Sequence, residues 1–139
     1  MQIVATAKKP RNQAISGRFW AGRTYRGRIK DDHKIDPACG TSGFLVAAGE
    51  YEKEHHREEI FFDRVKKDHY MNHMFHGYDM DRTMLRIGAM NMMTHGIDNP
   101  YIEYRDSLSD QNPDRNKYTL ILANPPFKGS LDYDIVSTD

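Results

Sequence analysis

The sequence predicts an α/β fold built around a mostly parallel sheet, in a single domain that starts near Ile35. From that residue onward, short apolar runs alternate with stretches of helical periodicity, which is typical of βαβ units. The chain has 139 residues and is 38% hydrophobic, enough for one modest core. These two observations set the fold class before any motif is considered.

Four strands and two sheet-covering helices are expected in order along the chain. One strand ends at Asp36, and the others lie near residues 74–79, 101–105 and 118–123, of which the last is the clearest apolar run. The helices are expected at residues 44–54 and 81–95. Their apolar faces are Phe44, Leu45, Ala48 and Tyr51 in the first, and Leu85, Gly88 or Ala89, and Met92 in the second.

The connections between these elements also have local signals. Gly96 is placed to stop the second helix, and Asn99-Pro100 then marks a turn before the third strand. The charged segment at residues 52–75 is interpreted as a solvated helix or an excursion from the sheet. It is rich in histidine, but no Cys or carboxylate completes a zinc ligand set at a usual spacing, so no metal site is predicted.

Residues 1–34 differ from the rest of the chain in charge and pattern. They hold nine Lys or Arg against two Asp, a net charge of +7, which the remaining residues balance. Interleaved aromatic residues (Phe19, Trp20 and Tyr25) are compatible with an arm that holds phosphates and stacks bases. Because apolar periodicity is absent, we interpret this segment instead as an irregular basic leader, separate from the domain at 35–139.

The same composition argues against two classes of protein. Cys39 is a lone cysteine and cannot form an internal disulfide, and no apolar run reaches the ~20 residues of a membrane span. We therefore expect a cytoplasmic protein with no membrane partner.

The stretch DPACGTSGFL, Asp36 to Leu45, is the first candidate for ligand binding. Small side chains from Ala38 to Gly43 let backbone N–H groups approach a ligand, and the following helix N-terminus favours a negatively charged group. The stretch is neither a P-loop nor G-x-G-x-x-G, which weakens the case for ATP or NAD. An ordinary tight βα turn is the alternative.

Two further acidic residues follow expected strand ends. Asp79 in GYDMD lies where α/β nucleotide-binding folds place a ribose-binding carboxylate, although the 39-residue spacing from Gly40 is long. Asp79 or Asp81 could equally serve as the N-cap of the next helix. Asp106 in RDSL is a similar loop carboxylate.

The last motif is NPPF, Asn124 to Phe127, after the apolar run at 118–123. Two prolines restrict themselves and the residues before them, so the turn is stiff. Such stiffness either positions a polar group or simply ends the strand.

In this order, DPACGTSGFL, GYDMD, RIGAMNMMTHGI, RDSL and NPPF resemble the N6-adenine DNA methyltransferases, most of all the modification subunit of type I restriction-modification systems. The resemblance covers residues 35–135. It implies a partial Rossmann-like, doubly wound fold, S-adenosylmethionine as cofactor and double-stranded DNA as substrate. It further implies a specificity subunit and a restriction subunit as partners.

The resemblance also implies a role for each motif residue and needs no metal. Asp36 and the loop would hold the methionine end of the cofactor, Asp79 the ribose hydroxyls and Asp106 the adenine amino group. The Asn124 side-chain carbonyl and the Pro125 backbone carbonyl would accept hydrogen bonds from the target adenine amine. The loop residues are Ala38, Cys39, Gly40, Thr41, Ser42 and Gly43, while Pro126 stiffens the turn and Phe127 stacks on the flipped base.

The resemblance fails at both ends of the chain. The family's cofactor-closing segment and apolar first strand are missing before Asp36, and IKDDHKI has only Ile29 and Ile35 as apolar residues. We therefore expect a truncated enzyme, incomplete or inactive alone, with a misread leader and an uncovered edge on the strand before NPPF. A protein glutamine N-methyltransferase and a non-catalytic nucleic-acid-binding fragment are the alternatives.

Overall fold

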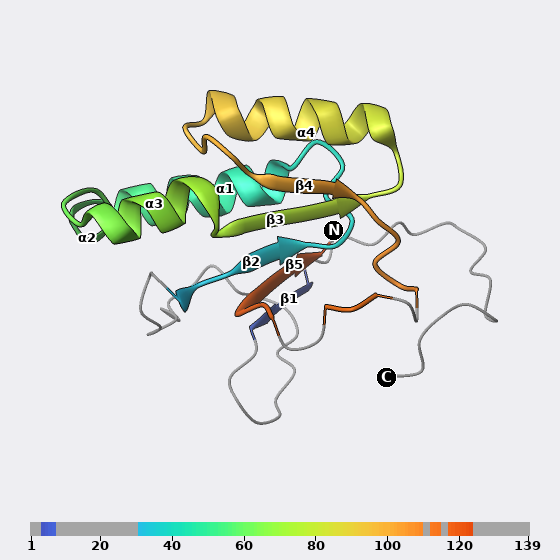
Figure 1. The fold of residues 1–139 in the computed structure, drawn as a ribbon, viewed down its shortest axis with the longest axis horizontal. Coiled ribbons are helices and arrows are strands. Elements are labelled where there is room, and N and C mark those ends of the chain that lie inside the picture. The colour runs from blue at the N-terminus through green and yellow to red at the C-terminus, as the bar shows by residue number, and fades with distance from the viewer. Residues whose placement is uncertain (1–3, 8–30, 110–111, 115–116, 124–139) are drawn as a thin grey trace.

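The fold is a five-stranded sheet with helices packed against it (Figure 1). The computed structural model describes residues 4–7, 31–109, 112–114 and 117–123. The strand order is β1-β5-β2-β3-β4, in which β2, β3, β4 and β5 are parallel and β1 is antiparallel to β5. In chain order the elements are β1 (Val4–Ala7), β2 (Lys34–Asp36), α1 (Gly43–His55), α2 (Arg57–Phe61), α3 (Arg64–Asn72), β3 (Phe75–Asp79), α4 (Arg82–Thr94), β4 (Tyr101–Tyr104) and β5 (Leu120–Ala123).

Helices α1 and α4 lie against the sheet and against each other. Helix α1 contacts β2, β3 and β5, and α4 contacts β3 and β4. The predicted buried positions of α4, Leu85, Gly88 and Met92, do face the core. In α1, Leu45 and Ala48 are buried while Phe44 and Tyr51 are half-buried. The two helices and the parallel sheet confirm a partial Rossmann-like α/β fold.

The core between the helices and the sheet is made of large apolar side chains. Leu45, Ile60, Met74 and Met92 are fully buried, and the ring of Tyr70 meets that of Phe75 edge-on, with centroids 5.4 Å apart. The Tyr70 hydroxyl donates to the Gly49 carbonyl at 3.0 Å, which joins α3 to α1. The charged segment at 52–75 therefore folds as the end of α1 plus two short helices anchored to the core.

Strand β2 forms although the sequence has few apolar residues there. Its three residues are all buried, and it pairs with both β3 and β5 at the centre of the sheet. The Lys34 ammonium is ion-paired with Asp32 and lies 3.0 Å from the Glu52 carboxylate of α1. These two partners offset part of the cost of burying the charge. The strand therefore forms without the apolar residues expected of it, and a carboxylate on α1 supplies one of the two partners that its buried lysine needs.

The structure corrects the expectation of an uncovered edge on the strand before NPPF, and residues 4–7 of the expected irregular leader form a strand. Val4–Ala7 pair with Ala123–Leu120, so β1 covers the outer edge of β5. Residues 8–30 lie outside the described part of the chain, and the proposed division at residue 34 stays a prediction.

The local stop and start signals around α4 are confirmed. Gly96 adopts a left-handed φ of +84° after the helix, and β4 begins directly after Pro100. Asp81 caps the N-terminus of α4 by accepting from the Thr83 N–H at 2.8 Å and the Met84 N–H at 3.2 Å. None of the described helices is long and apolar enough to cross a membrane.

Candidate cofactor site at the carboxyl edge of the sheet

Three carboxylates meet at the edge of the sheet where the parallel strands end. Asp36 and Asp79 are the last residues of β2 and β3, and Asp106 follows β4 by two residues. The strands are adjacent and in register, with Asp36 beside Gly77 and Asp79 beside Tyr104. This edge is where ligands bind in open α/β sheets. The three acidic residues singled out from the sequence are thus brought together.

Asp36 is a buried carboxylate with little compensation. Its side chain accepts a hydrogen bond from the Ala38 N–H at 3.1 Å, and the residue is 2% exposed. Burial raises the pKa of Asp36 to about 6, opposed by the Ala38 hydrogen bond and reinforced by the negative charge of Asp79. No ion pair between described residues involves Asp36, Asp79 or Asp106. The edge therefore suits a ligand that carries a positive charge.

The loop from Ala38 to Gly43 is tied to the end of β3 by its backbone. The Gly40 N–H donates to the Asp79 carboxylate at 2.9 Å, and the Cys39 N–H donates to the Tyr78 carbonyl at 2.9 Å. Gly40 and Ser42 have left-handed φ values of +50° and +62°, so the chain turns sharply into α1. This is more than a simple βα turn, because a specific side chain of the neighbouring strand holds it.

The loop leaves room beside its glycines. A Cβ built on Gly40 or Gly43 meets no atom of the described residues within 4 Å. Thr41 is exposed at the same place, whereas Ser42 is fully buried. Burial raises the pKa of the Cys39 thiol to about 11, so this cysteine stays neutral and is a packing residue rather than a nucleophile.

Helix α4 supports the loop from the other side, which the sequence did not reveal. A Cβ on Gly88 would come within 2.6 Å of the Ser42 hydroxyl and 2.9 Å of the Gly40 carbonyl, so only glycine allows this approach. The Asn91 side-chain amide donates to the Thr41 carbonyl at 2.9 Å. Gly88 was predicted only as a buried position, and Asn91 was missed because its partner is 50 residues away in the chain.

Of the two roles considered for Asp79, the structure excludes the N-cap of α4, and ribose binding stays a prediction. Asp81, and not Asp79, accepts the hydrogen bonds from the first turn. Asp79 instead accepts from the Gly40 N–H and, through its other oxygen, from the Asp81 N–H at 2.9 Å. Asp79 is half-buried, so lone pairs of its carboxylate stay accessible to a ligand.

Asp106 lies in a turn that is fastened to the Asp36 loop. It accepts from the Leu108 N–H at 2.9 Å and is exposed. The neighbouring Ser107 hydroxyl donates to the Pro37 carbonyl at 2.8 Å. This bond joins the ends of β2 and β4 across β3, so the three carboxylates belong to one connected edge.

The candidate catalytic residues Asn124, Pro125, Pro126 and Phe127 lie outside the described residues. The strand before them is described: β5 is parallel to β2, with Ile121 beside Ile35. Its last residue, Ala123, is therefore at the carboxyl end of the sheet, next to the Asp36 strand. The catalytic role of the four residues in NPPF stays a prediction.

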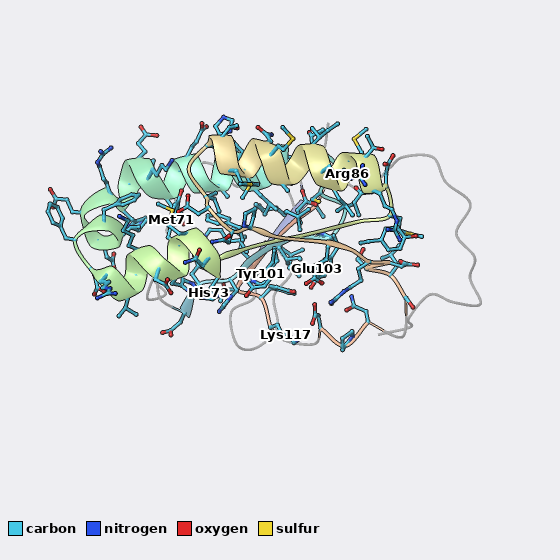
Figure 2. The ribbon with its side chains drawn as sticks, turned by 45° about the horizontal axis from the view of Figure 1, so that its top comes forward. Met71, His73, Arg86, Tyr101, Glu103 and Lys117 are labelled. Carbon is cyan, nitrogen blue, oxygen red and sulfur yellow. The ribbon has the colours of Figure 1, made fainter. Side chains whose placement is uncertain are left out.

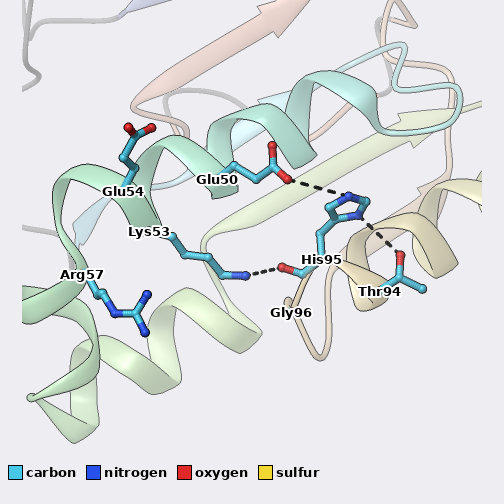
Figure 3. A pocket seen from close by; sticks show the side chains of 7 residues that line it. All are labelled: Glu50, Lys53, Glu54, Arg57, Thr94, His95 and Gly96. Carbon is cyan, nitrogen blue, oxygen red and sulfur yellow. Dashed lines mark hydrogen bonds and ion pairs between the residues drawn. The ribbon is translucent and has the colours of Figure 1, made fainter.

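A surface hollow elsewhere on the molecule is separate from this edge. A groove of about 470 Å³ lies where α1 and α4 end, and Figure 3 shows Lys53 reaching the His95 carbonyl within it. Lys53 thereby caps the C-terminus of α4 and complements its dipole. The groove contains none of the motif residues and is lined by Glu50, Lys53, Glu54, Arg57, Thr94, His95 and Gly96.

The predicted absence of a zinc site concerns the histidines of α3 and β3. The rings of His69 and His76 are hydrogen-bonded to backbone carbonyls, of Asp32 at 2.6 Å and of His73 at 2.9 Å. Among the residues with described positions, no group of three or more His, Cys, Asp or Glu is arranged to hold a metal ion. The structure assigns these rings to packing and backbone bonding.

Known proteins are similar to this chain in sequence and in fold. Residues 25–139 match the family model described as N-6 DNA Methylase. The type II methyltransferase M.MamI of Microbacterium ammoniaphilum is 32% identical over 107 residues, which cover 75% of this chain and 28% of that protein. The type I MjaVII methylase subunit of Methanocaldococcus jannaschii is 27% identical over 100 residues, covering 70% and 15%.

A solved structure supports the fold independently. The crystal structure of the type I restriction enzyme EcoKI M protein superposes with a TM-score of 0.66 over 82% of this chain and 27% of that chain, at 24% identity. The chain thus spans less than a third of these relatives. The resemblance drawn from the motifs is confirmed, and the family match begins ten residues before the predicted domain boundary. On this evidence of sequence and fold, the chain belongs to the N-6 DNA methylase family.

Proposed function

We propose that this chain forms the cofactor-binding part of an enzyme that transfers a methyl group from S-adenosylmethionine to N6 of adenine in DNA. The observation that carries the proposal is the carboxyl edge of the sheet. There Asp36, Asp79 and Asp106 surround a loop with open space beside Gly40 and Gly43. S-adenosylmethionine carries an ammonium group, ribose hydroxyls and an adenine amino group, which are all hydrogen-bond donors that carboxylates accept.

The three carboxylates fit this cofactor in charge as well as in hydrogen-bonding capacity. Asp36 is buried and has no ion-pair partner among the described residues, so an ammonium group would compensate its charge. Asp79 still has acceptor capacity for ribose hydroxyls, and exposed Asp106 can accept from an adenine amino group. When bound, the cofactor supplies an activated methyl group on a sulfonium centre.

The other half of the chemistry falls to the NPPF turn. The amine of adenine is a poor nucleophile because its lone pair is delocalised into the ring. Acceptors at Asn124 and Pro125 would hold this amine and favour a tetrahedral nitrogen, while Phe127 stacks on the flipped base. The position of β5 beside β2 supports this role, because the chain enters the turn at the cofactor edge.

The wider assignment follows the relatives. Several are methylase subunits of type I restriction enzymes, so double-stranded DNA is the proposed substrate. A specificity subunit and a restriction subunit are the proposed partners. The identity of the nucleophile is a separate question. The lone pair of a planar glutamine amide nitrogen is delocalised like that of the adenine amine, so the NPPF turn could act on either group.

A titration of S-adenosylmethionine into the purified chain tests the cofactor site. The wild type and Asp98→Asn, an exposed change outside the site, are expected to bind alike, and Asp79→Asn should weaken binding at least tenfold. Circular dichroism checks that all three proteins are folded. Equal binding by all three would refute the assigned site, and no binding by a folded wild type would refute a cofactor site in this chain.

A second assay separates the substrates. Radiolabelled methyl transfer is measured to duplex DNA and to protein, with the partner subunits of the same system added. Label recovered as N6-methyladenine supports the proposal, and label on glutamine would replace it with protein methylation. DNA binding without any transfer would favour the non-catalytic alternative.

A further inference from the structure

An aspartate whose side chain is nearly inaccessible lies at the centre of a hydrogen-bonded cluster that the motifs do not include. Asp114, with 4% of its side chain exposed, accepts from the Arg105 guanidinium at 2.7 Å and from the Tyr118 hydroxyl at 2.9 Å. It also accepts from the Tyr78 hydroxyl and from the Lys117 ammonium. These five residues, Tyr78, Arg105, Asp114, Lys117 and Tyr118, are called the Asp114 clasp below.

The clasp is held by charge as well as by hydrogen bonds. Burial alone would raise the pKa of Asp114, but the bonds from Lys117 and both tyrosines and the charge of Arg105 lower it well below its usual range. Burial and the bond to Asp114 raise the pKa of Tyr78 to about 12, so its hydroxyl stays a donor. The Arg105 guanidinium also lies 4.5 Å from the centre of the Tyr78 ring.

The clasp residues are sequence neighbours of the proposed cofactor ligands. Tyr78 immediately precedes Asp79, and Arg105 immediately precedes Asp106. Asp114 comes from the connection between β4 and β5. Figure 2 shows Glu103 and Lys117 on the side of the sheet away from α4, and Glu103 binds the second nitrogen of Arg105 at 2.8 Å. The Asp114 carboxylate thus ties the ends of β3 and β4, through Tyr78 and Arg105, to the connection between β4 and β5.

We infer that Asp114, through this clasp, is a positioning residue that sets the separation of Asp79 and Asp106 for the adenosine part of the cofactor. The inference rests on the proposed function. At the strand ends themselves, the Arg105 N–H donates to the Asp79 carbonyl at 3.2 Å, and the Ser107 hydroxyl ties the Asp106 turn to the Asp36 loop. The clasp adds a side-chain tie from Tyr78 and Arg105 to the connection that leads to β5. Loss of the Asp114 charge would leave the Arg105 guanidinium without its closest partner and loosen the tie between this turn and the connection to β5.

The inference predicts a loss of ligand discrimination rather than a general loss of binding. Asp106 would accept a hydrogen bond from the adenine amino group, so S-inosylhomocysteine, which lacks that group, should bind the wild type about tenfold more weakly than S-adenosylhomocysteine. In Asp114→Asn this ratio should fall to near one, because Asp106 no longer lies at the right distance. A purely structural loss would weaken both ligands equally and leave the ratio unchanged.

Calorimetric titration of both ligands into the full chain tests this, with Asp98→Asn as the matched control on the surface. Tyr118→Phe, which removes one of four donors to Asp114, should lower the ratio only in part, and it serves if Asp114→Asn does not fold. An unchanged ratio in Asp114→Asn, or in a folded Tyr118→Phe, would overturn the role of the clasp. A wild type that binds neither ligand would overturn the proposed function as well.

Discussion

Replacement of Asp36 by asparagine should stabilise the fold at neutral pH while it removes cofactor binding. The pKa of Asp36 rises from 3.8 to about 6 in the folded chain, chiefly because the carboxylate is buried. At about 1.4 kcal/mol per pKa unit, the ionised form costs the fold roughly 3 kcal/mol. Asparagine keeps the oxygen that accepts from the Ala38 N–H but carries no charge to desolvate.

The sign of the effect follows from which state binds the proton more tightly. Because the folded pKa is raised, the stability linked to Asp36 is fully present below pH 3.8 and is lost as the pH rises through about 6. The variant has no such loss. It should therefore match the wild type near pH 4 and exceed it by up to about 3 kcal/mol at pH 8, or roughly 10 °C in Tm.

Urea unfolding of both proteins at pH 4 and pH 8 measures this difference. Every other titrating group is shared, so the change in the difference between the two pH values isolates Asp36. In parallel, S-adenosylmethionine should bind the wild type more tightly as the pH rises through about 6, and this dependence should vanish in Asp36→Asn. A stability difference that is the same at both pH values would refute the burial argument. Full binding by the variant would refute the proposed role of the charge.

Three further predictions concern the loop, the central strand and the sheet. Gly88→Ala should destabilise the fold by about 1–3 kcal/mol, measured by thermal unfolding, because the added Cβ would contact Ser42. Gly43→Ala has open space at its Cβ, so it should keep the stability of the fold but weaken S-adenosylmethionine binding, measured by calorimetry. Lys34→Met should cost about 3–5 kcal/mol in urea unfolding, because two buried carboxylates lose their cation, and a cost below 1 kcal/mol would contradict this. Burial lowers the pKa of His76 to about 4, so its contribution to stability is lost as the pH falls from 6.5 through 4. His76→Phe should therefore reduce the slope of the unfolding free energy against pH between pH 4 and 6.5. An unchanged slope would exclude this histidine as the source of the pH dependence.

Local patterns in the sequence were sufficient for the two sheet-covering helices and for bringing the acidic candidate residues to one edge of the sheet. The apolar spacing of Leu85, Gly88 and Met92 identified the buried face of α4, since a helix repeats its face every 3.6 residues. Asp36 and Asp79 were found because each ends a strand, and parallel strands bring their carboxyl ends to one edge. Such signals depend on residues close in the chain, so they can be read without the fold.

Other features could not be predicted because their partners are distant in the chain. Asp79 and Asp81 are both acidic and two residues apart, and only the fold shows that Asp81 caps α4 while Asp79 accepts from the Gly40 N–H, 39 residues earlier in the chain. Asn91 and Asp114 carried no signal at all, since each acquires its role from partners on other elements.

The sequence by itself determined the family, the two sheet-covering helices and a mostly parallel sheet. The tertiary structure alone decided that the polar strand at Lys34 could occupy the centre of that sheet, and that β1 would cover the edge of β5. The physical reason is the same in both cases. A buried charge or an unpaired strand edge is tolerated only when a partner from elsewhere in the chain satisfies it, and the fold supplies that partner.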